Sequence, residues 1–290
     1  MGRVGIIGVG NMGGGIAAHL LDQGWQVQVH DIDAVKVAFF EEKGAAARTS
    51  TASAATEVVA LIVCVVDAQQ VDEVLFGPQG AVQAMREGQA VLLCPTIAPQ
   101  DVERFAARLA ERGIDAIDAP MSGGPARARD GSMILMVACS DAAFERHRAL
   151  IEAISRKVFR ISQKPGDGAR TKLVNNLLAG INLAGAAEVM ALAQRLGLDL
   201  SRTLDVIGQS SGQSWIGEDR LRRAIAGDYA PRAHVTLLEK DTRLALEAAR
   251  AAGFHGELGP LAQTLFARAA AAGYAGLDDA ALFKLFAPEQ

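Results

Sequence analysis

The chain has 290 residues, half of them hydrophobic, and its 29 basic and 33 acidic residues give a formal net charge of −4. This length exceeds what a single hydrophobic core usually spans, so we expect a larger and a smaller domain. Nucleic-acid recognition needs a concentrated basic face, and the balanced charge argues against one. The densest basic segment holds Arg220, Arg222 and Arg223, which we expect on a solvated helix face.

Up to residue 162, short apolar runs alternate with amphipathic helical stretches. This alternation is typical of right-handed βαβ units, so it predicts an α/β fold with a mainly parallel, doubly wound Rossmann sheet. The predicted strands are 3–8, 26–30, 61–66, 90–94, 114–118 and 133–139.

The pattern changes after Gly168, where strand-like runs end and alanine and leucine recur at helical spacing to Phe286. This spacing predicts an all-helical second domain. We place the boundary at the loop 162–166, which gives a Rossmann domain at residues 1–162 and a helical domain at residues 163–290.

The helix predicted to begin near Gly168 is long and apolar enough between residues 173 and 193 to raise the question of a membrane span. Three asparagines and Glu188 interrupt this stretch, so we expect a helix buried between domains and no membrane partner. Its small residues form one stripe that another helix can approach, either in a second subunit or in the same chain. The stripe is Gly180, Ala184, Ala187 and Ala191.

The three cysteines, Cys64, Cys94 and Cys139, have no close spacing and lie in apolar runs, so we expect buried reduced thiols and no metal site. The first predicted strand begins at residue 3, which leaves no room for a signal peptide. We therefore expect a cytoplasmic protein.

A G-x-G-x-x-G segment directly follows the first predicted strand and opens a predicted helix. Glycines there allow a tight turn and let backbone amides approach a pyrophosphate at the helix N-terminus. The residues expected to bind cofactor in this segment are Gly8, Gly10, Asn11, Met12 and Gly13.

Asp31 closes the second predicted strand, where a carboxylate can accept hydrogen bonds from the adenosine ribose. The alternative role for Asp31 is the N-cap of the next helix, although Asp33 can also fill it. An NADP enzyme needs a cation near the 2′-phosphate, but Ile32 follows Asp31. The sequence therefore predicts NAD as the cofactor.

Two further loops lie at the carboxyl ends of predicted strands, where doubly wound sheets bind ligands. Val65, Val66 and Asp67 end the third predicted strand, and Thr96 follows the fourth. We expect these residues to contact the cofactor, and Thr96 to meet the nicotinamide ribose, unless it is an ordinary loop hydroxyl.

Two segments carry the remaining candidates, Asp118-Ala119-Pro120-Met121-Ser122-Gly123-Gly124 and 166–176, which holds Lys172, Asn175 and Asn176. With the glycine loop and the pair Lys240-Asp241, they resemble the β-hydroxyacid dehydrogenase family over essentially the whole chain. The resemblance implies a dinucleotide domain and an all-helical domain joined by a long helix at the active-site cleft. It also implies a homodimer or homotetramer.

Carried over by motif, Lys172 matches the catalytic lysine of the family, and Asn176 matches an asparagine that helps to hold the substrate. Ser122, Gly123 and Gly124 match the loop that binds the substrate carboxylate. Lys240 matches a residue that reaches the cofactor. Trp215 is expected to line the nicotinamide pocket, with core packing as the alternative.

Physical chemistry supports a catalytic lysine at this position. Lys172 and Asn176 lie one helical turn apart, so both can address one small molecule. An unperturbed lysine titrates near ~10.4 and is a poor base at neutral pH. We expect burial beside the cationic nicotinamide to lower the pKa of Lys172, so that the neutral amine accepts the hydroxyl proton.

Within the family, the stretches 212–215, 227–232 and 272–279 resemble the L-threonate dehydrogenase branch. This implies oxidation of a small hydroxy acid, L-threonate, to its 2-oxo acid. Tartronate semialdehyde (2-hydroxy-3-oxopropionate) reduction and 3-hydroxyisobutyrate oxidation remain alternatives. An imine reductase and a non-catalytic binding module are more remote alternatives for the function. The presence of Lys172 argues against both, and Asp31, which favours NAD, also argues against an imine reductase.

Overall fold

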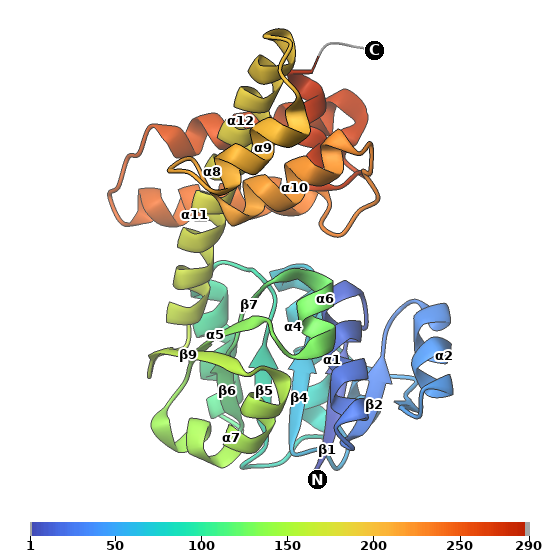
Figure 1. Ribbon diagram of the computed structural model, residues 1–290. Helices are drawn as coiled ribbons and strands as arrows, with labels where there is room; N and C mark the ends of the chain where they lie inside the picture. The colour runs from blue at the N-terminus through green and yellow to red at the C-terminus, as the bar shows by residue number, and fades with distance from the viewer. Residues whose placement is uncertain (1, 288–290) are drawn as a thin grey trace. The chain divides into compact units, whose positions relative to one another are not determined.

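The computed structural model, which describes residues 2–287, has a nine-stranded sheet in the order β3-β2-β1-β4-β5-β6-β8-β7, with β9 paired to β8 (Figure 1). β1 to β6 pair in parallel, as do β8 and β9, whereas β8 is antiparallel to β6 and β7. The mainly parallel sheet is therefore confirmed. The strands are β1 Arg3–Ile7, β2 Gln26–His30, β3 Ala46–Ala47, β4 Ala60–Val63, β5 Ala90–Leu93, β6 Asp115–Asp118, β7 Met121–Ser122, β8 Ile134–Ala138 and β9 Lys157–Ser162.

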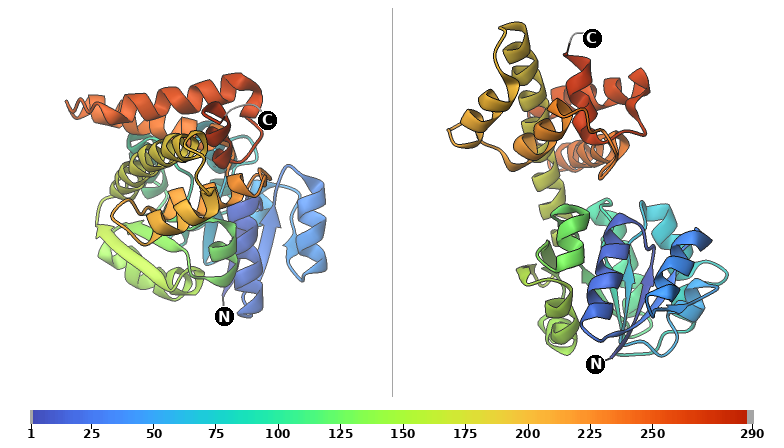
Figure 2. Two further views of the ribbon diagram at one scale, coloured as in Figure 1. Left: turned by 45° about the horizontal axis from the view of Figure 1, so that its top comes forward. Right: turned by 45° about the vertical axis from the view of Figure 1, so that its right-hand side comes forward.

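Helices cover both faces of this sheet, because successive strand residues point to opposite sides and both sides are apolar (Figure 2). In β4, Ala60 and Ile62 join one core while Leu61 and Val63 join the other. The first core is closed by α1 Asn11–Asp22, α2 Ala34–Glu42, α6 Gly124–Asp130 and α7 Asp141–Ile154. The second is closed by α3 Thr51–Ala54, α4 Ala68–Phe76 and α5 Pro99–Ala110.

The strand order reverses at β1, which pairs with β2 on one side and with β4 on the other. Ligands of doubly wound sheets bind outside the carboxyl ends of the strands at such a reversal. The residues that follow β1 and β4 are Gly8 and Cys64, so the expected ligand position lies at the glycine loop and the loop after β4.

Three short or edge strands, β3, β7 and β9, were not among the predicted strands. β9 contains no fully buried residue and carries Lys157 and Arg160, so its apolar pattern is weak. The predicted domain boundary after residue 162 falls at the end of β9. The compact units of the chain divide between Lys172 and Leu173, inside α8 (Asp167–Arg195), and we call them the Rossmann unit and the helical unit.

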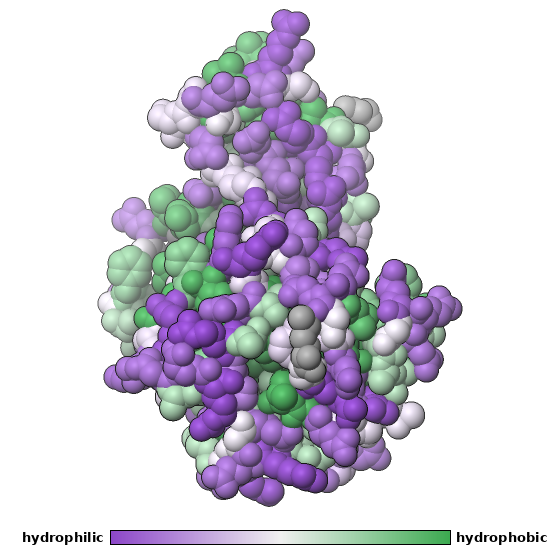
Figure 3. All heavy atoms as spheres, turned by 60° about the horizontal axis from the view of Figure 1, so that its bottom comes forward, coloured by the Kyte–Doolittle hydropathy of each residue, from purple (hydrophilic) through white to green (hydrophobic). Residues whose placement is uncertain are grey.

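The far end of the Rossmann unit, where β1 begins, has a mostly hydrophilic surface with smaller apolar patches (Figure 3). A hollow of about 300 Å³ lies at the starts of β1 and β2 and is lined by Arg3, Trp25 and Gln26 among others. It is at the opposite end of these strands from the glycine loop and is not part of the candidate site.

The helical unit contains most of α8 and the elements that follow it, and its all-helical character is confirmed. The later elements are α9 Leu200–Gly208, α10 Trp215–Ile225, α11 Val235–Ala251, α12 Leu258–Ala269, a π turn at Ala270–Tyr274 and a 3₁₀ helix at Asp279–Leu285.

The small-residue stripe of α8 packs within its own chain. Ala184, Ala187 and Ala191 belong to the core of the helical unit, and a Cβ on Gly180 would lie 2.7 Å from the Thr242 Cγ2 atom. The alternative of burying this stripe against a second subunit is therefore wrong. α8 is long and apolar enough to span a membrane, but its buried residues make it the core helix of this unit.

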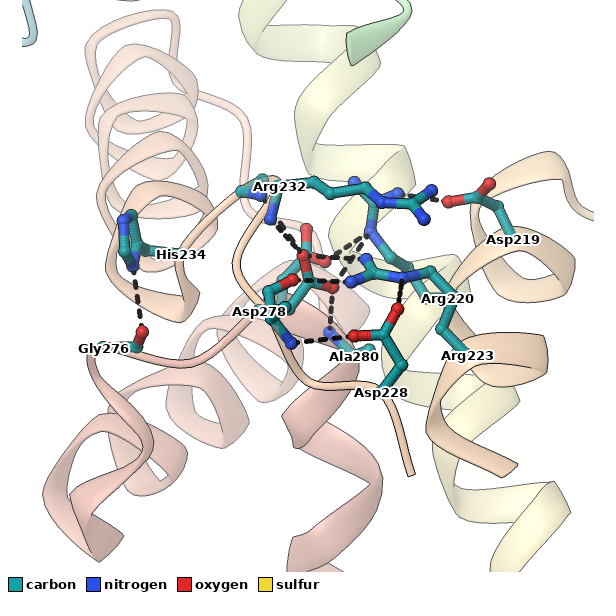
Figure 4. Close-up of polar contacts among 12 residues, drawn as sticks. Asp219, Arg220, Arg223, Asp228, Arg232, His234, Gly276, Asp278 and Ala280 are labelled. Atoms are coloured by element: carbon teal, nitrogen blue, oxygen red, sulfur yellow. Dashed lines mark hydrogen bonds and ion pairs between the residues drawn. The ribbon is translucent and has the colours of Figure 1, made fainter. Parts of the chain in front are cut away.

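Two of the three arginines expected on a solvated face, Arg220 and Arg223, instead have side chains only 11% and 9% exposed and form ion pairs within the helical unit (Figure 4). Arg220 pairs with Asp279, and the Arg223 Nη1 atom lies 2.9 Å from the Asp278 Oδ2 atom. Only Arg222 has an exposed side chain, at 51%. The expectation is wrong because the acidic partners lie some sixty residues further along the chain, at the start of the 3₁₀ helix.

We expect Asp279 to make stability depend on pH. Burial raises the pKa of Asp279 to about 7, although Arg220 opposes this shift. The folded protein therefore retains a proton that the unfolded chain releases near pH ~4, so this group's contribution to stability falls as pH rises from about 4 through about 7. Denaturant unfolding of wild type and Asp279→Asn between these pH values measures the effect.

The wild type should lose stability relative to Asp279→Asn as pH rises, because asparagine does not titrate. Asp205→Asn, which removes an exposed carboxylate paired with Arg222, is the matched control and should show no such trend. A constant difference between wild type and Asp279→Asn would refute the assignment.

Candidate active site

The three motif glycines of the loop 8–13 differ in what surrounds them. Gly8 has a φ of +85°, and a Cβ there would lie 2.7 Å from the Cys64 carbonyl oxygen. A Cβ on Gly13 would lie 2.0 Å from the Gly8 carbonyl oxygen, so both positions require glycine for the turn and for close packing. A Cβ on Gly10 meets no heavy atom of the described chain within 4 Å. Gly10 therefore leaves open space where the loop faces outward.

The start of α1 suits an anion at this opening. Its N-cap is Gly10, which has no side chain to cap the first amides, and exposed Asn11 is the first helical residue. The unpaired amides of a helix N-terminus bind phosphate groups. Half-buried Met12 packs instead against the core beneath the loop.

Asp31 lies beside the same loop, directly after β2. Its Oδ2 atom accepts a hydrogen bond from the Val9 amide at 2.8 Å, and its Oδ1 atom accepts one from the Asp33 amide at 2.9 Å. Asp33, not Asp31, is the N-cap of α2, since its side chain accepts from the Val35 amide. Each Asp31 oxygen has a further lone pair to offer a ribose hydroxyl. The loop and Asp31 thus fit a dinucleotide.

The loops after β4 and β5 place the other predicted cofactor residues at the carboxyl edge of the sheet. Val65 is half-buried and Val66 is 51% exposed. Asp67 is the N-cap of α4, and its side chain accepts a hydrogen bond from the Gln70 amide. This capping role is structural and independent of any contact with the cofactor. Thr96 is half-buried just beyond β5. Their contacts with the cofactor remain predictions.

The segment Ser122-Gly123-Gly124 connects β7 to α6 and has an unusual backbone. Gly123 has a φ of +134° and Gly124 a φ of +78°, conformations that side chains other than glycine rarely adopt. α6 itself is held close to α1, because a Cβ on Gly15 would lie 2.8 Å from the Ala128 Cβ atom. Gly15, which follows the loop 8–13 on α1, thus also helps to position the loop at Ser122, Gly123 and Gly124.

Lys172 lies in the second turn of α8 and is only 9% exposed. Asn176 follows four residues later on the same helix and is 8% exposed. A buried lysine is uncommon, because burial disfavours the ammonium form. Both side chains therefore differ from the solvated polar groups usual on a helix surface.

In the helical unit, Asn176 belongs to a polar network with α11. The Asn176 Nδ2 atom donates to the Asp241 Oδ2 atom at 2.6 Å, and the Asn176 Oδ1 atom accepts from Asn175 at 3.0 Å. The Lys240 Nζ atom lies 3.1 Å from the Asp241 Oδ1 atom. Buried Asp241 therefore links the two predicted residues Asn176 and Lys240, and it leaves Asn176 one amide hydrogen to donate elsewhere.

Asn176→Ala is expected to raise KM for the hydroxy acid about tenfold, the usual effect of losing one hydrogen bond to a bound ligand. Asn182 supplies the control, because Asn182→Ala makes the same change further along α8, at a residue outside the network of Asn176, Asn175 and Asp241. Steady-state kinetics with saturating cofactor measures both. Equal KM values for Asn176→Ala and wild type would remove Asn176 from the substrate-binding residues.

Trp215 begins α10 and is 47% exposed, so the alternative of core packing is wrong. Together with Glu218, Arg222 and Arg232 it lines a hollow of about 460 Å³ in the helical unit. Its predicted contact with the nicotinamide pocket remains a prediction.

Comparison with known proteins identifies the family. A model of the NAD binding domain of 6-phosphogluconate dehydrogenase matches residues 3–162, and one described as NAD-binding of NADP-dependent 3-hydroxyisobutyrate dehydrogenase matches residues 166–286. L-Threonate dehydrogenase of Escherichia coli O6:H1 is 40% identical over 98% of this chain and 94% of its own length. The chain belongs to the β-hydroxyacid dehydrogenase family.

Two other relatives agree with this assignment. The 3-hydroxyisobutyrate dehydrogenase of Pseudomonas aeruginosa is 33% identical, covering 99% of both chains. A solved structure of 3-hydroxyisobutyrate dehydrogenase from Salmonella typhimurium has a TM-score of 0.92 at 38% identity, covering 98% of this chain and 99% of that chain. The protein is therefore an oxidoreductase of the hydroxyacid dehydrogenase class with a nicotinamide dinucleotide cofactor, as the sequence predicted.

Two residues of this β-hydroxyacid dehydrogenase were named in motifs but not assigned a role. Asp241 follows Lys240 directly, and its contact with Asn176 spans 65 positions. Asp118 begins the segment that contains Ser122, and its carboxylate contacts Gly166 and Ala169. Their position in the motifs indicated that Asp118 and Asp241 could matter. Their contacts could not be predicted from the sequence, because the partner residues are 48 or more positions away in the chain.

Proposed function

We propose that this β-hydroxyacid dehydrogenase oxidises L-threonate to its 2-oxo acid with NAD, and that Lys172 is the proton-transferring group. The substrate is supported by the L-threonate dehydrogenase relatives, of which the one from Escherichia coli O6:H1 is 40% identical over 98% of this chain. The observation that carries the role of Lys172 is its burial, at 9% exposure, four residues before Asn176 on α8. Burial favours a neutral amine, which is the form that can accept a proton.

In the proposed reaction, the Lys172 amine accepts the proton of the substrate hydroxyl as the carbon loses a hydride. A bound nicotinamide dinucleotide supplies the hydride acceptor for oxidation and the donor for reduction. In the reverse direction, the Lys172 ammonium donates its proton to the carbonyl oxygen of the oxo acid. Loss of a proton and a hydride together accounts for the two electrons removed from the alcohol.

The other side chains are proposed to bind and orient the substrate. The amides of Gly123 and Gly124, with the Ser122 hydroxyl, suit an anionic carboxylate, since glycines with positive φ leave their amides accessible. Asn176 retains one amide hydrogen for a substrate oxygen. Lys240 and Trp215 are proposed to reach the cofactor and the nicotinamide pocket.

The cofactor is proposed to be NAD rather than NADP. The Asp31 carboxylate would repel a 2′-phosphate, and Ile32 is 99% exposed where an NADP enzyme needs a cation. The cofactor-contacting residues proposed around it are Gly8, Gly10, Asn11, Met12, Gly13, Val65, Val66, Asp67 and Thr96.

The proposal also covers assembly and location. A homodimer or homotetramer is supported by exposed apolar side chains of the helical unit, such as Val189, Leu192 and Leu261. A cytoplasmic location is supported by the metabolic class of the relatives, which act on small hydroxy acids by name.

The substrate is tested by NADH formation from L-threonate, D-glycerate and 3-hydroxyisobutyrate, and by NADH consumption with tartronate semialdehyde. We expect kcat/KM for L-threonate to exceed that for each other acid at least about tenfold, since a site that hydrogen-bonds additional hydroxyls rejects acids that lack them. A higher kcat/KM for 3-hydroxyisobutyrate would contradict the substrate and leave the activity class intact.

A further inference from the structure

A buried carboxylate lies at the start of α8, the helix that carries Lys172. Asp118, the last residue of β6, is 1% exposed. Its Oδ2 atom accepts hydrogen bonds from the Gly166 amide at 2.8 Å and from the Ala169 amide at 3.0 Å. Amides in the first turn of a helix have no partner within the helix, so Asp118 supplies the missing acceptor.

The fit between Asp118 and this turn is tight. A Cβ on Gly168 would lie 2.9 Å from the Asp118 Cγ atom, so only glycine permits this approach. The Oδ1 atom has no hydrogen-bond partner among the described residues. Burial raises the pKa of Asp118 to about 6, although hydrogen bonds from the backbone of Ala169, Gly166 and Gly168 oppose the shift.

Asp118 connects two segments of the Rossmann unit that the proposed reaction uses. It stands four residues before Ser122 in the chain, and it binds α8 at Ala169, three residues before Lys172. At a rise of about 1.5 Å per residue, Lys172 lies roughly one turn above the anchored amide. The Arg170–Glu103 ion pair also links this turn to α5, but both side chains are nearly half exposed. Ion pairs as exposed as this one contribute little to stability.

We propose that Asp118 is a positioning residue, whose carboxylate fixes the first turn of α8 and thereby the Lys172 amine relative to the Ser122 loop. This inference rests on the proposed function of Lys172. Asp118 itself is not expected to touch substrate or cofactor.

Asp118→Ala should lower kcat about 100-fold, because a displacement of about 1 Å at a reacting group has an effect of this size. The dissociation constant for NADH should stay within about twofold of wild type, since the glycine loop and Asp31 are untouched. Asp118→Asn should restore kcat to within about fivefold of wild type. Its amide oxygen can take the acceptor position, and its amide nitrogen the position of the unpartnered Oδ1 atom.

The controls separate positioning from stability and from the function of Lys172. Arg170→Met removes the exposed ion pair between Glu103 and the same helical turn, and it should leave kcat unchanged. Melting temperatures establish that each variant is folded, and Gly168→Ala, with an expected loss in kcat of about tenfold, replaces Asp118→Ala if the latter does not fold. Lys172→Met is measured in parallel.

Full activity of Lys172→Met would refute the proposed function rather than this inference alone. If Lys172→Met is inactive while folded Asp118→Ala, or Gly168→Ala in its place, has wild-type kcat, the positioning role is overturned. An Asp118→Asn variant as inactive as Asp118→Ala would also overturn it, because acceptor geometry would then not be what Asp118 contributes.

Discussion

Replacement of Lys172 by methionine is expected to lower kcat for hydroxy-acid oxidation by about 10³-fold, within the range that a positioned general base contributes. Methionine has similar length and tolerates a buried position, so the fold should persist at a site that is 9% exposed. Binding of NADH should change little, because the glycine loop and Asp31 are unaltered. Stopped-flow and steady-state kinetics with L-threonate measure the loss.

The pH dependence distinguishes a base from a residue that merely fills space. The rate of oxidation by wild type should increase as pH rises, because the neutral Lys172 amine becomes more populated. The residual activity of Lys172→Met should not show this increase with pH. Lys164→Met makes the same substitution at an exposed lysine ahead of α8 and should behave as wild type. A Lys172→Met enzyme with wild-type kcat or an unchanged pH profile would refute the role.

Cofactor preference should change strongly on substitution at the end of β2. Wild type should prefer NAD over NADP at least about 100-fold in kcat/KM, and Asp31→Asn with Ile32→Arg should reduce this ratio to about one or below. Hydrogen bonds to a charged group are worth about 1.5–3 kcal/mol, and an arginine can pair with the 2′-phosphate. Ile32 is 99% exposed, so arginine needs no repacking.

Asparagine is chosen at position 31 because it can still accept from the Val9 amide and preserve the loop. Asp33→Asn removes a carboxylate two residues away that caps α2 and should leave the NAD preference intact. Kinetics with both cofactors measure the ratio. A wild-type enzyme that uses NADP as well as NAD would contradict the role of Asp31.

The sequence was most informative where residues adjacent in the chain act together. The glycine loop, its preceding strand and its following helix are local, so their pattern predicted the turn that Gly8 and Gly13 form. Buried strands such as β4 and β5 are continuous apolar runs and were equally clear. Edge strand β9 and two-residue β7 lack such runs and were missed.

Contacts between distant segments could not be predicted in the same way. The basic run at Arg220 to Arg223 has the composition of a solvated face, and only the fold places Asp278 and Asp279 against it. Likewise, the contact of Asp118 with the start of α8 joins residues 48 positions apart. The small-residue stripe of α8 predicted close approach, but it did not specify the partner that Thr242 and Phe266 provide.

The central claim is that the Lys172 amine exchanges a proton with the substrate oxygen. A crystal structure of the protein with NADH and the bound hydroxy acid tests it most directly. The account predicts the Lys172 Nζ atom within about 2.6–3.2 Å of the reacting hydroxyl oxygen. An amine that points into bulk solvent, with another titratable group at that oxygen, would contradict it.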